Sequence, residues 1–395
     1  MRGAGGAGTA GAAGAGGGGA NLLALRSHNA ALVLDLLRTA GDEGISRLEL
    51  AERTGLTPQA VSKITARLRE DGLAAEAGRR ASTGGKPRTV LRLVPEAGHA
   101  VGVHLDRDEV RVVLVDLRGT VVGERRAALD LGAGAEAVLG AVRETVAGVL
   151  PAGLEGASRQ GPAGLDRAPR QGPAASPALL GAGVALPGPL DHARGVLHRV
   201  TGFPEWGGFP LREALAERLG VPVVVDKDTN AAALGLAAGG EGGSFAYLHL
   251  GTGLGAGLVI GGGVHRGART GAGEFGHQVI QLDGPPCTCG NRGCIEALCL
   301  EAVARGDLEE AARVLGAGAA NLVGLLDIDI VLLGGRTVAA APEAFTGGVG
   351  AVLKARARRT GQDAVPVRVA AGGDGAVAVG AAQLVLGPVF GRGGG

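Results

Sequence analysis

The chain has 395 residues and a net charge of +1, and 46% of its residues are hydrophobic although only 2% are aromatic. A chain of this length can build two or three domains with aliphatic cores. We find no basic segment followed by an apolar leader and no apolar run of about 18 residues, which argues against export and against membrane insertion. We therefore expect a cytoplasmic protein.

The charge is distributed unevenly along the chain. Residues 21–95 contain twelve Lys and Arg residues against eight Asp and Glu residues, a net of +4, whereas the whole chain carries +1. The remainder is therefore mildly acidic. A basic N-terminal segment ahead of an acidic body is typical of a DNA-binding domain attached to a second module, although scattered surface charge can give the same balance.

Two segments have a strongly biased composition. Residues 1–20 are almost entirely Gly and Ala and cannot bury a core, so we expect a disordered tail. Residues 151–177 contain the sequence RQGPA twice and separate strand-like segments. This pattern predicts a flexible insertion within a domain.

The N-terminal segment has the pattern of short helices. Ser46 and Glu49 are spaced as a capping box at the start of one helix, and Thr57 followed by Pro58 predicts the start of the next. Two helices joined by a short Gly-containing turn and followed by a hairpin predict a winged helix-turn-helix domain. We place this domain at residues 21–95.

The helix that begins after Thr57 is the candidate recognition helix. Val61, Ile64 and Leu68 are spaced to face the preceding helices, which turns a polar and partly basic set outward. Exposed polar faces are usually only solvated, but these side chains suit phosphate and base-edge contacts in the major groove. The candidate DNA-contacting residues are Thr57, Gln59, Ser62, Lys63 and Arg67. The stretch GGKPR at 84–88 is either a further contact beside the wing or a linker.

From residue 98 onward, strand-like and helical segments alternate. The expected strands are 99–105, 109–117, 120–129, 179–186, 221–226, two around a Gly turn in 244–264, 329–335 and 365–370. Helical patterns lie between them, at 134–149, 210–220 and 229–238 and in a helix-rich stretch before residue 329. The alternation predicts an α/β domain of two lobes with a cleft between them, which we place at residues 96–395.

Three of the four cysteines lie within CTCGNRGC, residues 287–294. One imidazole and three thiolates form the closed tetrahedral set that is usual for structural zinc. A Cys287–Cys289 disulfide would be strained, and a redox pair normally has two residues between its cysteines at a helix start. The pattern predicts one structural zinc per chain, bound by His277, Cys287, Cys289 and Cys294. Cys299 is then a core thiol outside the site.

The metal motif is part of a longer ordered series. GEFGH at 273–277 and CTCGNRGCIE at 287–296 resemble the signature of the ROK family, which is named for repressors, open reading frames and sugar kinases. Four further segments occur in the order that this family shows: LPGPLD (186–191), DTNAAALG (228–235), HLGTGLGAGLVIGGGVHRGA (249–268) and LLGG (332–335). The N-terminal winged helix is similar to that of the repressor branch. The resemblance implies an actin-like ATPase fold of the sugar-kinase type, with a sugar bound between the lobes.

By position, the resemblance also implies a set of sugar-contacting residues. Asp228 matches the aspartate that serves the kinases as general base, although it can instead cap the following helix. His277 can bind zinc through one nitrogen and a sugar hydroxyl through the other. Lys227 stands where the family usually has Asn, and because lysine only donates, an anionic sugar becomes conceivable. The implied ligand-binding residues are Lys227, Asp228, Glu274, His277 and Glu296.

The stretch that matches the first phosphate loop of the sugar kinases is HLDRDEV at 104–110. It has His104 in place of an aspartate, and the carboxylates of Asp106 and Asp108 would repel a nucleotide phosphate. The second loop survives as GTGLG, either as a vestigial phosphate loop or as a tight turn, with Gly251, Thr252, Gly253 and Gly255. We therefore expect no kinase activity and no catalytic residue.

These interpretations predict a sugar-responsive DNA-binding transcriptional regulator, a repressor of carbohydrate-utilisation genes. It would bind an inverted-repeat operator as a homodimer or tetramer and take a small sugar or sugar derivative as effector. Two alternatives stay open. One is an ATP-dependent, glucokinase-like sugar kinase with a DNA-binding head, and the other is a DNA-binding protein controlled by a partner protein rather than by a sugar.

Overall fold

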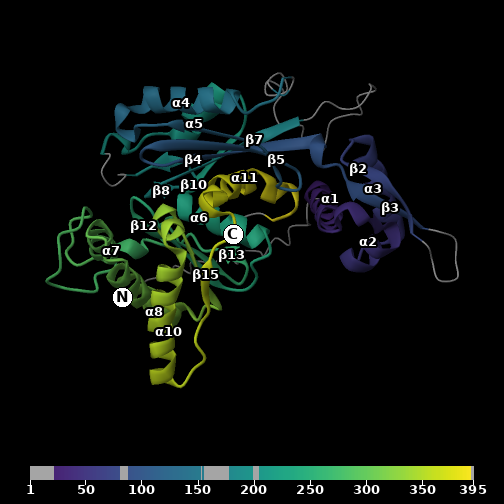
Figure 1. Ribbon diagram of the computed structural model, residues 1–395. Coiled ribbons are helices and arrows are strands. Elements are labelled where there is room, and N and C mark those ends of the chain that lie inside the picture. Colours follow the sequence, from purple (N-terminus) through teal and green to yellow (C-terminus); the bar gives the residue numbers. More distant parts are fainter. Residues whose placement is uncertain (1–21, 81–87, 153, 155–177, 199–203, 393–395) are drawn as a thin grey trace, which may run out of the picture.

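The structure is a computed structural model that describes residues 22–80, 88–152, 154, 178–198 and 204–392. The expected tail (1–20), most of the expected insertion (151–177) and most of GGKPR (84–88) lie outside the described residues. A small N-terminal domain and two larger lobes are visible in Figure 1. Within the described residues, no helix is long and apolar enough to cross a membrane.

The N-terminal domain is a winged helix-turn-helix, as predicted. Its helices are α1 (Leu22–Thr39), α2 (Arg47–Thr54) and α3 (Pro58–Glu70), and its sheet has the order β1 (Ile45–Ser46), β3 (Arg88–Leu93), β2 (Ala74–Arg80). The capping box is confirmed, because Ser46 Oγ accepts from Glu49 N and Glu49 Oε2 accepts from Ser46 N. Gly55 adopts a left-handed conformation, with φ of 70°, where α2 ends and the turn toward α3 begins.

The first lobe is built on a five-stranded sheet. Its strand order is β10 (Val223–Lys227), β7 (Ala178–Leu186), β4 (Gly98–Leu105), β5 (Glu109–Asp116), β6 (Val121–Ala128). Strands β4, β5 and β6 pair antiparallel, whereas β4, β7 and β10 pair parallel. The lobe also contains α4 (Ala135–Ala147), α5 (Leu211–Leu219) and the short hairpin of β8 (Leu190–Asp191) and β9 (Val196–Leu197).

The second lobe repeats this topology. Its strand order is β13 (Gly263–Val264), β12 (Leu254–Ile260), β11 (Phe245–Leu250), β14 (Ile330–Gly334), β15 (Val367–Val369). Again three antiparallel strands are extended by two parallel strands. The helices are α7 (Ile295–Ala304), α8 (Leu308–Leu326), α9 (Arg336–Ala340) and α10 (Pro342–Thr360). The expected two-lobed α/β architecture is confirmed.

Two helices, α6 (Asp228–Ala238) and α11 (Ala376–Val389), lie beside each other below the first sheet in Figure 1. Their packing depends on glycines. A Cβ atom on Gly183 of β7 would lie 1.8 Å from the Ala381 carbonyl oxygen, and one on Gly380 would lie 1.9 Å from the Ala231 carbonyl oxygen. The backbone of α11 is therefore in direct contact with the sheet on one side and with α6 on the other.

The N-terminal domain shares one hydrophobic core with the body of the molecule. Leu386 and Phe390, at the end of α11, belong to the same buried cluster as Val33 and Leu37 of α1. The Arg38 guanidinium lies 5.4 Å from the centroid of the Phe390 ring. This arrangement fixes the head against the C-terminal helix.

Candidate ligand cleft, metal centre and DNA interface

A cavity of about 90 Å³ lies between the two lobes, and residues from distant parts of the sequence line it. The structure brings all five expected ligand-binding residues into this lining: Lys227, Asp228, Glu274, His277 and Glu296. Thr252, Gly253 and Gly255 of the GTGLG turn between β11 and β12 line the same cavity, whereas Gly251 is not part of its lining. His249 is a further lining residue that sequence reasoning missed.

Asp228 is the first residue of α6, and Lys227 occupies the N-cap position. The Asp228 Oδ1 atom accepts a hydrogen bond from Thr229 N at 2.6 Å. A carboxylate in the first turn is stabilised by the positive end of the helix dipole. Asp228 is therefore not the N-cap of α6, and its carboxylate is available to the cleft.

Lys227 is paired within the protein. Its side chain is only 3% exposed, and its Nζ atom donates to Glu274 Oε1 at 3.0 Å and to the Ala272 carbonyl oxygen. The positive charge is therefore compensated by Glu274. This pairing removes the sequence-based reason for expecting an anionic ligand.

Other buried polar contacts hold the cleft in shape. Glu296 Oε2 accepts from Leu254 N at 2.8 Å and so fixes the end of the GTGLG turn. Asp226, which is 1% exposed, accepts from Arg266 Nε at 2.8 Å and from Asn230 Nδ2 at 2.9 Å. These contacts connect the start of α6 in the first lobe to the segment after β13 in the second. Sequence reasoning did not identify Asp226 or Arg266.

The stretch matched to the first phosphate loop of the kinases contacts the GTGLG turn. Thr252 Oγ1 donates to Asp106 Oδ1 at 3.3 Å across the cleft. Beneath this contact, burial lowers the pKa of His104 although the nearby Asp228 and Asp106 oppose the shift. A buried imidazole with a lowered pKa therefore lies in β4, next to the turn that contacts the GTGLG turn across the cleft.

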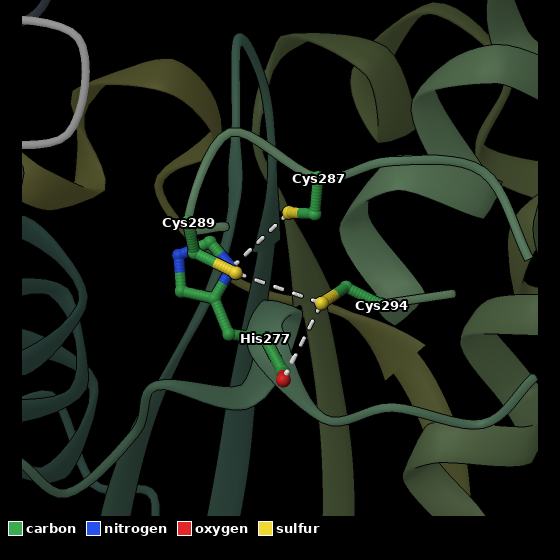
Figure 2. A group of neighbouring side chains, drawn as sticks. All are labelled: His277, Cys287, Cys289 and Cys294. Carbon is green, nitrogen blue, oxygen red and sulfur yellow. Dashed lines mark hydrogen bonds between the residues drawn. The ribbon is translucent and has the colours of Figure 1, made fainter. Parts of the chain in front are cut away.

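The predicted metal ligands form a compact cluster, shown in Figure 2. One potential ligand atom from each of His277, Cys287, Cys289 and Cys294 lies within 4.8 Å of all the others. Cys289 Sγ is 3.7 Å from Cys294 Sγ, and Cys287 Sγ is 3.6 Å from His277 Nδ1. Metal–sulfur bonds of about 2.3 Å at tetrahedral angles place two sulfur ligands about 3.8 Å apart. The side chains therefore fit a tetrahedral metal ion.

Within this cluster the thiol of Cys294 has a strongly shifted pKa. Burial, followed by the neighbouring thiols of Cys289 and Cys287, raises the pKa of Cys294 to about 12. A thiolate at this position therefore requires a positive charge beside it. Cys299 lies apart from the cluster, buried in the core of the second lobe, where its thiol donates to the Ala311 carbonyl oxygen.

The outer face of α3 carries the candidate DNA-contacting residues. Thr57 is the N-cap of the helix, and its side chain accepts from Ala60 N. Gln59, Ser62, Lys63 and Arg67 are all exposed, whereas Val61 and Leu68 are buried against the rest of the domain. These polar side chains therefore lie on the side of α3 that faces away from the core of the N-terminal domain.

Models of two known families match the chain. The ROK family model matches residues 170–306, which include the cleft residues on α6 and the metal cluster. A model of a winged helix-turn-helix DNA-binding domain matches residues 33–74, which include α3.

Two similar proteins of known name are regulators. The xylose repressor of Bacillus subtilis (strain 168) is 29% identical over 256 residues, which cover 64% of this chain and 61% of that protein. The DNA-binding transcriptional dual regulator NagC of Escherichia coli (strain K12) is 32% identical over 291 residues, which cover 71% of this chain and 64% of NagC. The chain thus spans slightly less than two thirds of the length of each of these relatives.

Two solved structures are similar over nearly their full length. A ROK family transcriptional regulator, a homologue of the E. coli MLC protein, has a TM-score of 0.71 at 20% identity, covering 93% of this chain and 98% of that one. The ROK hexokinase from Thermus thermophilus is 31% identical with a TM-score of 0.54, covering 72% of this chain and 96% of that one.

The fold and the cleft define a two-lobed, sugar-kinase-like domain joined to a winged helix-turn-helix domain. The chain belongs to the ROK family.

Proposed function

We propose that this protein is a sugar-responsive, DNA-binding transcriptional repressor of the cytoplasm. Residues 21–95 would bind the operator, and residues 96–395 would bind the effector. The observation that carries the proposal is the core that both parts share, because Phe390 at the end of α11 packs against α1 of the DNA-binding head. A change in the arrangement of the two lobes would therefore be transmitted to the head through these packed side chains.

The proposed DNA contacts lie on α3. Gln59, Ser62 and Lys63 would reach base edges, Arg67 would contact phosphate, and Thr57 would contribute at the helix start. Two heads related by a two-fold axis would read an inverted repeat, so the working form would be a homodimer or a dimer of dimers.

The proposed effector is a small sugar in the cleft. The carboxylates of Asp228 and Glu274 are acceptors for sugar hydroxyl groups, and His277 and Glu296 extend the same lining. The relatives are named for xylose and N-acetylglucosamine, so these two sugars are the first to test.

The proposed metal is one structural zinc ion. It would be held by the closed set of His277, Cys287, Cys289 and Cys294, and it would stiffen the loop that carries a cleft residue. Because His277 both lines the cleft and points its Nδ1 atom at Cys287, metal binding would orient an effector contact.

We further propose that the protein is not a kinase. A nucleotide phosphate placed between the Thr252 turn and the β4–β5 turn would meet the carboxylate of Asp106, which lines the cavity. The alternative, a sugar kinase with a DNA-binding head, is favoured by the likeness to the ROK hexokinase. A coupled ATPase assay with a panel of sugars separates the two. Steady sugar-dependent turnover that disappears in Asp228→Asn would establish the kinase.

The proposed function is tested by selecting tight-binding duplexes from a random DNA library with the full-length protein. Affinity for the selected duplex is then measured with and without xylose or N-acetylglucosamine. We expect a selected inverted repeat, binding that weakens in the Lys63→Ala/Arg67→Ala variant, and release by one of the sugars. Equal affinity in wild type and variant would contradict the regulator, and specific DNA binding with no response to any sugar would favour control by a partner protein.

A further inference from the structure

A cluster of charged side chains joins the two lobes beside the cleft. Arg336 begins α9 in the second lobe, whereas Asp106 and Asp108 lie in the turn between β4 and β5 in the first lobe. The Arg336 guanidinium donates to Asp106 Oδ2 at 2.8 Å and to the two oxygens of Asp108 at 2.9 and 3.1 Å. We call these three residues the latch.

The latch is continuous with the lining of the cleft. Asp106 and the adjacent Arg107 both line the cavity, and Asp106 also accepts the hydrogen bond from Thr252 of the GTGLG turn. Asp108 and Arg336 are not part of the lining. The latch therefore ties a cleft-lining turn to α9, and two of its three residues, Asp108 and Arg336, do not themselves reach into the cavity.

The latch is more exposed than the fully buried ion pair between the lobes. The Asp226 and Arg266 side chains are 1% and 7% exposed, whereas in the second pair Lys227 is 3% and Glu274 is 42% exposed. In the latch, Asp106 is 19% exposed, Arg336 is 46% exposed and Asp108 is 60% exposed. Exposed ion pairs contribute little stability and weaken with salt, whereas a buried pair is costly to separate. The Asp226–Arg266 pair is therefore costly to separate, whereas the exposed contact between Arg336 and Asp108 costs little to break.

Both carboxylates of the latch are charged at neutral pH. The hydrogen bond from Arg336 lowers the pKa of Asp108. Burial alone would raise the pKa of Asp106, but the hydrogen bond from the Arg107 backbone N–H and the Arg336 guanidinium lower it. The ionic form of the latch is therefore the form present in the cell.

We propose that the latch is a reversible clamp that holds the cleft closed over its sugar, with Arg336 as a positioning residue. The proposal rests on the proposed function, because it assumes that the sugar binds between the lobes. When the latch is formed, the β4–β5 turn stays against the GTGLG turn, and a bound sugar leaves only after these contacts break. A ligand that prefers the closed arrangement loses affinity when closure is weakened.

The first test needs no ligand. Hydrogen exchange is measured by mass spectrometry in the full-length protein, for peptides that cover residues 103–112 and 249–256. We compare the wild type with Arg336→Met and Asp108→Asn, two exposed positions outside the cavity lining. The control is Arg313→Met, which removes an exposed ion pair with Glu310 inside α8.

If the latch holds the two turns together, both peptides should exchange faster in Arg336→Met and in Asp108→Asn. They should also exchange faster in the wild type at high salt, and Arg313→Met should exchange at the wild-type rate. The double variant Arg336→Met/Asp108→Asn should exchange no faster than Arg336→Met alone, because both substitutions remove the same interaction. Unchanged exchange in Arg336→Met and Asp108→Asn would overturn the proposal.

The second test uses xylose and N-acetylglucosamine as probes. For the sugar that binds, the latch variants should raise the dissociation rate and the Kd roughly two- to tenfold, and Arg313→Met should leave both unchanged. Equal dissociation rates in wild type and latch variants would overturn the clamp. If neither sugar binds the wild type, the proposed effector fails for these probes, and the exchange measurement alone decides the latch.

Discussion

His277 is part of two groups of residues at once, the lining of the cleft and the cluster of candidate metal ligands. Its imidazole lines the cleft, while its Nδ1 atom lies 3.6 Å from Cys287 Sγ in the metal cluster. A ligand held by a metal through one ring nitrogen has a fixed orientation at the other. If the cluster holds the proposed zinc, loss of that zinc should therefore disturb the cleft as well as the loop.

Replacing Cys289 with Ser should remove the metal. A hydroxyl is a poorer ligand than a thiolate, and closed zinc sites contribute directly to the free energy of folding. We expect the zinc content of the variant to fall below the wild-type value of about one per chain. Its melting temperature should also fall. Cys299→Ala is the control, because that thiol lies in the core away from the cluster and its loss should leave zinc in place. Full zinc content in Cys289→Ser would disprove the assignment.

Replacing Asp228 with Asn should weaken sugar binding without unfolding the protein. The side-chain oxygen of Asn can still accept from Thr229 N, but the amide nitrogen then presents a donor where a hydroxyl needs an acceptor. The mismatch should cost about 1–3 kcal/mol of binding free energy, measurable by calorimetry. Asp307→Asn is the matched control, since Asp307 caps α8 away from the cleft and Asn caps equally well. Unaltered sugar affinity in Asp228→Asn would show that this carboxylate does not contact the ligand.

Some site residues were predictable from the sequence and others were not. The metal cluster could be predicted because its four residues lie within a short stretch whose chemistry has few uses. The pairs Asp226–Arg266 and Asp106–Arg336 join residues 40 and 230 positions apart. No local pattern reports such a contact, because it depends on how the two lobes are placed. Lys227 was noticed as unusual, but its pairing with Glu274 required the three-dimensional arrangement.

At the scale of elements, regular strands and capped helices were the most predictable features. The expected strand at 99–105 corresponds to β4, and Thr57 is the N-cap of α3 as predicted. The two-residue strands β1, β8, β9 and β13 were missed as separate strands because they are too short to show alternation. The helix-rich stretch before residue 329 was not divided into α7 and α8. In α11, the glycines serve close packing, which composition alone does not reveal.

Close packing around α11 predicts opposite effects for two glycine substitutions. A Cβ on Gly380 would lie 1.9 Å from the Ala231 carbonyl oxygen, so Gly380→Ala should destabilise the protein by about 1–3 kcal/mol. Gly350 in α10 has open space at the same position, and Gly350→Ala should stabilise by up to about 1 kcal/mol through helix propensity. Denaturant titration measures both. A neutral Gly380→Ala would mean that α6 and α11 are not in tight contact.

The proposed phosphate contact of Arg67, on the exposed face of α3, can be tested through the salt dependence of DNA binding. If Arg67 contacts a phosphate, Arg67→Ala should weaken binding to all sequences and reduce the slope of log K against log salt by about 1. Arg358→Ala, at the exposed end of α10, removes the same charge far along the chain from the head and should leave the slope unchanged. Equal slopes in wild type and Arg67→Ala would place Arg67 outside the interface.

At the scale of the whole molecule, contacts run without a break from the cleft to the head. Asp228 opens α6, α6 packs on α11, and the end of α11 packs on α1 through Phe390. The two-lobed architecture was predictable because the motifs stand in a recognisable order, whereas the repeated strand order of the two lobes became visible only in the structure. The docking of the head on α11 was not predictable either, because the contacting residues come from the two ends of the chain.

The most direct test of the account measures both ligands on one full-length protein. DNA affinity is determined with and without the sugar, and sugar affinity with and without the selected inverted repeat. Coupling of this kind is usually about 1–3 kcal/mol, so each ligand should change the affinity of the other by roughly 5- to 150-fold, and by the same factor. Affinities that are each specific but independent of the other ligand would contradict the claim that this ROK protein senses a sugar to control its binding to DNA.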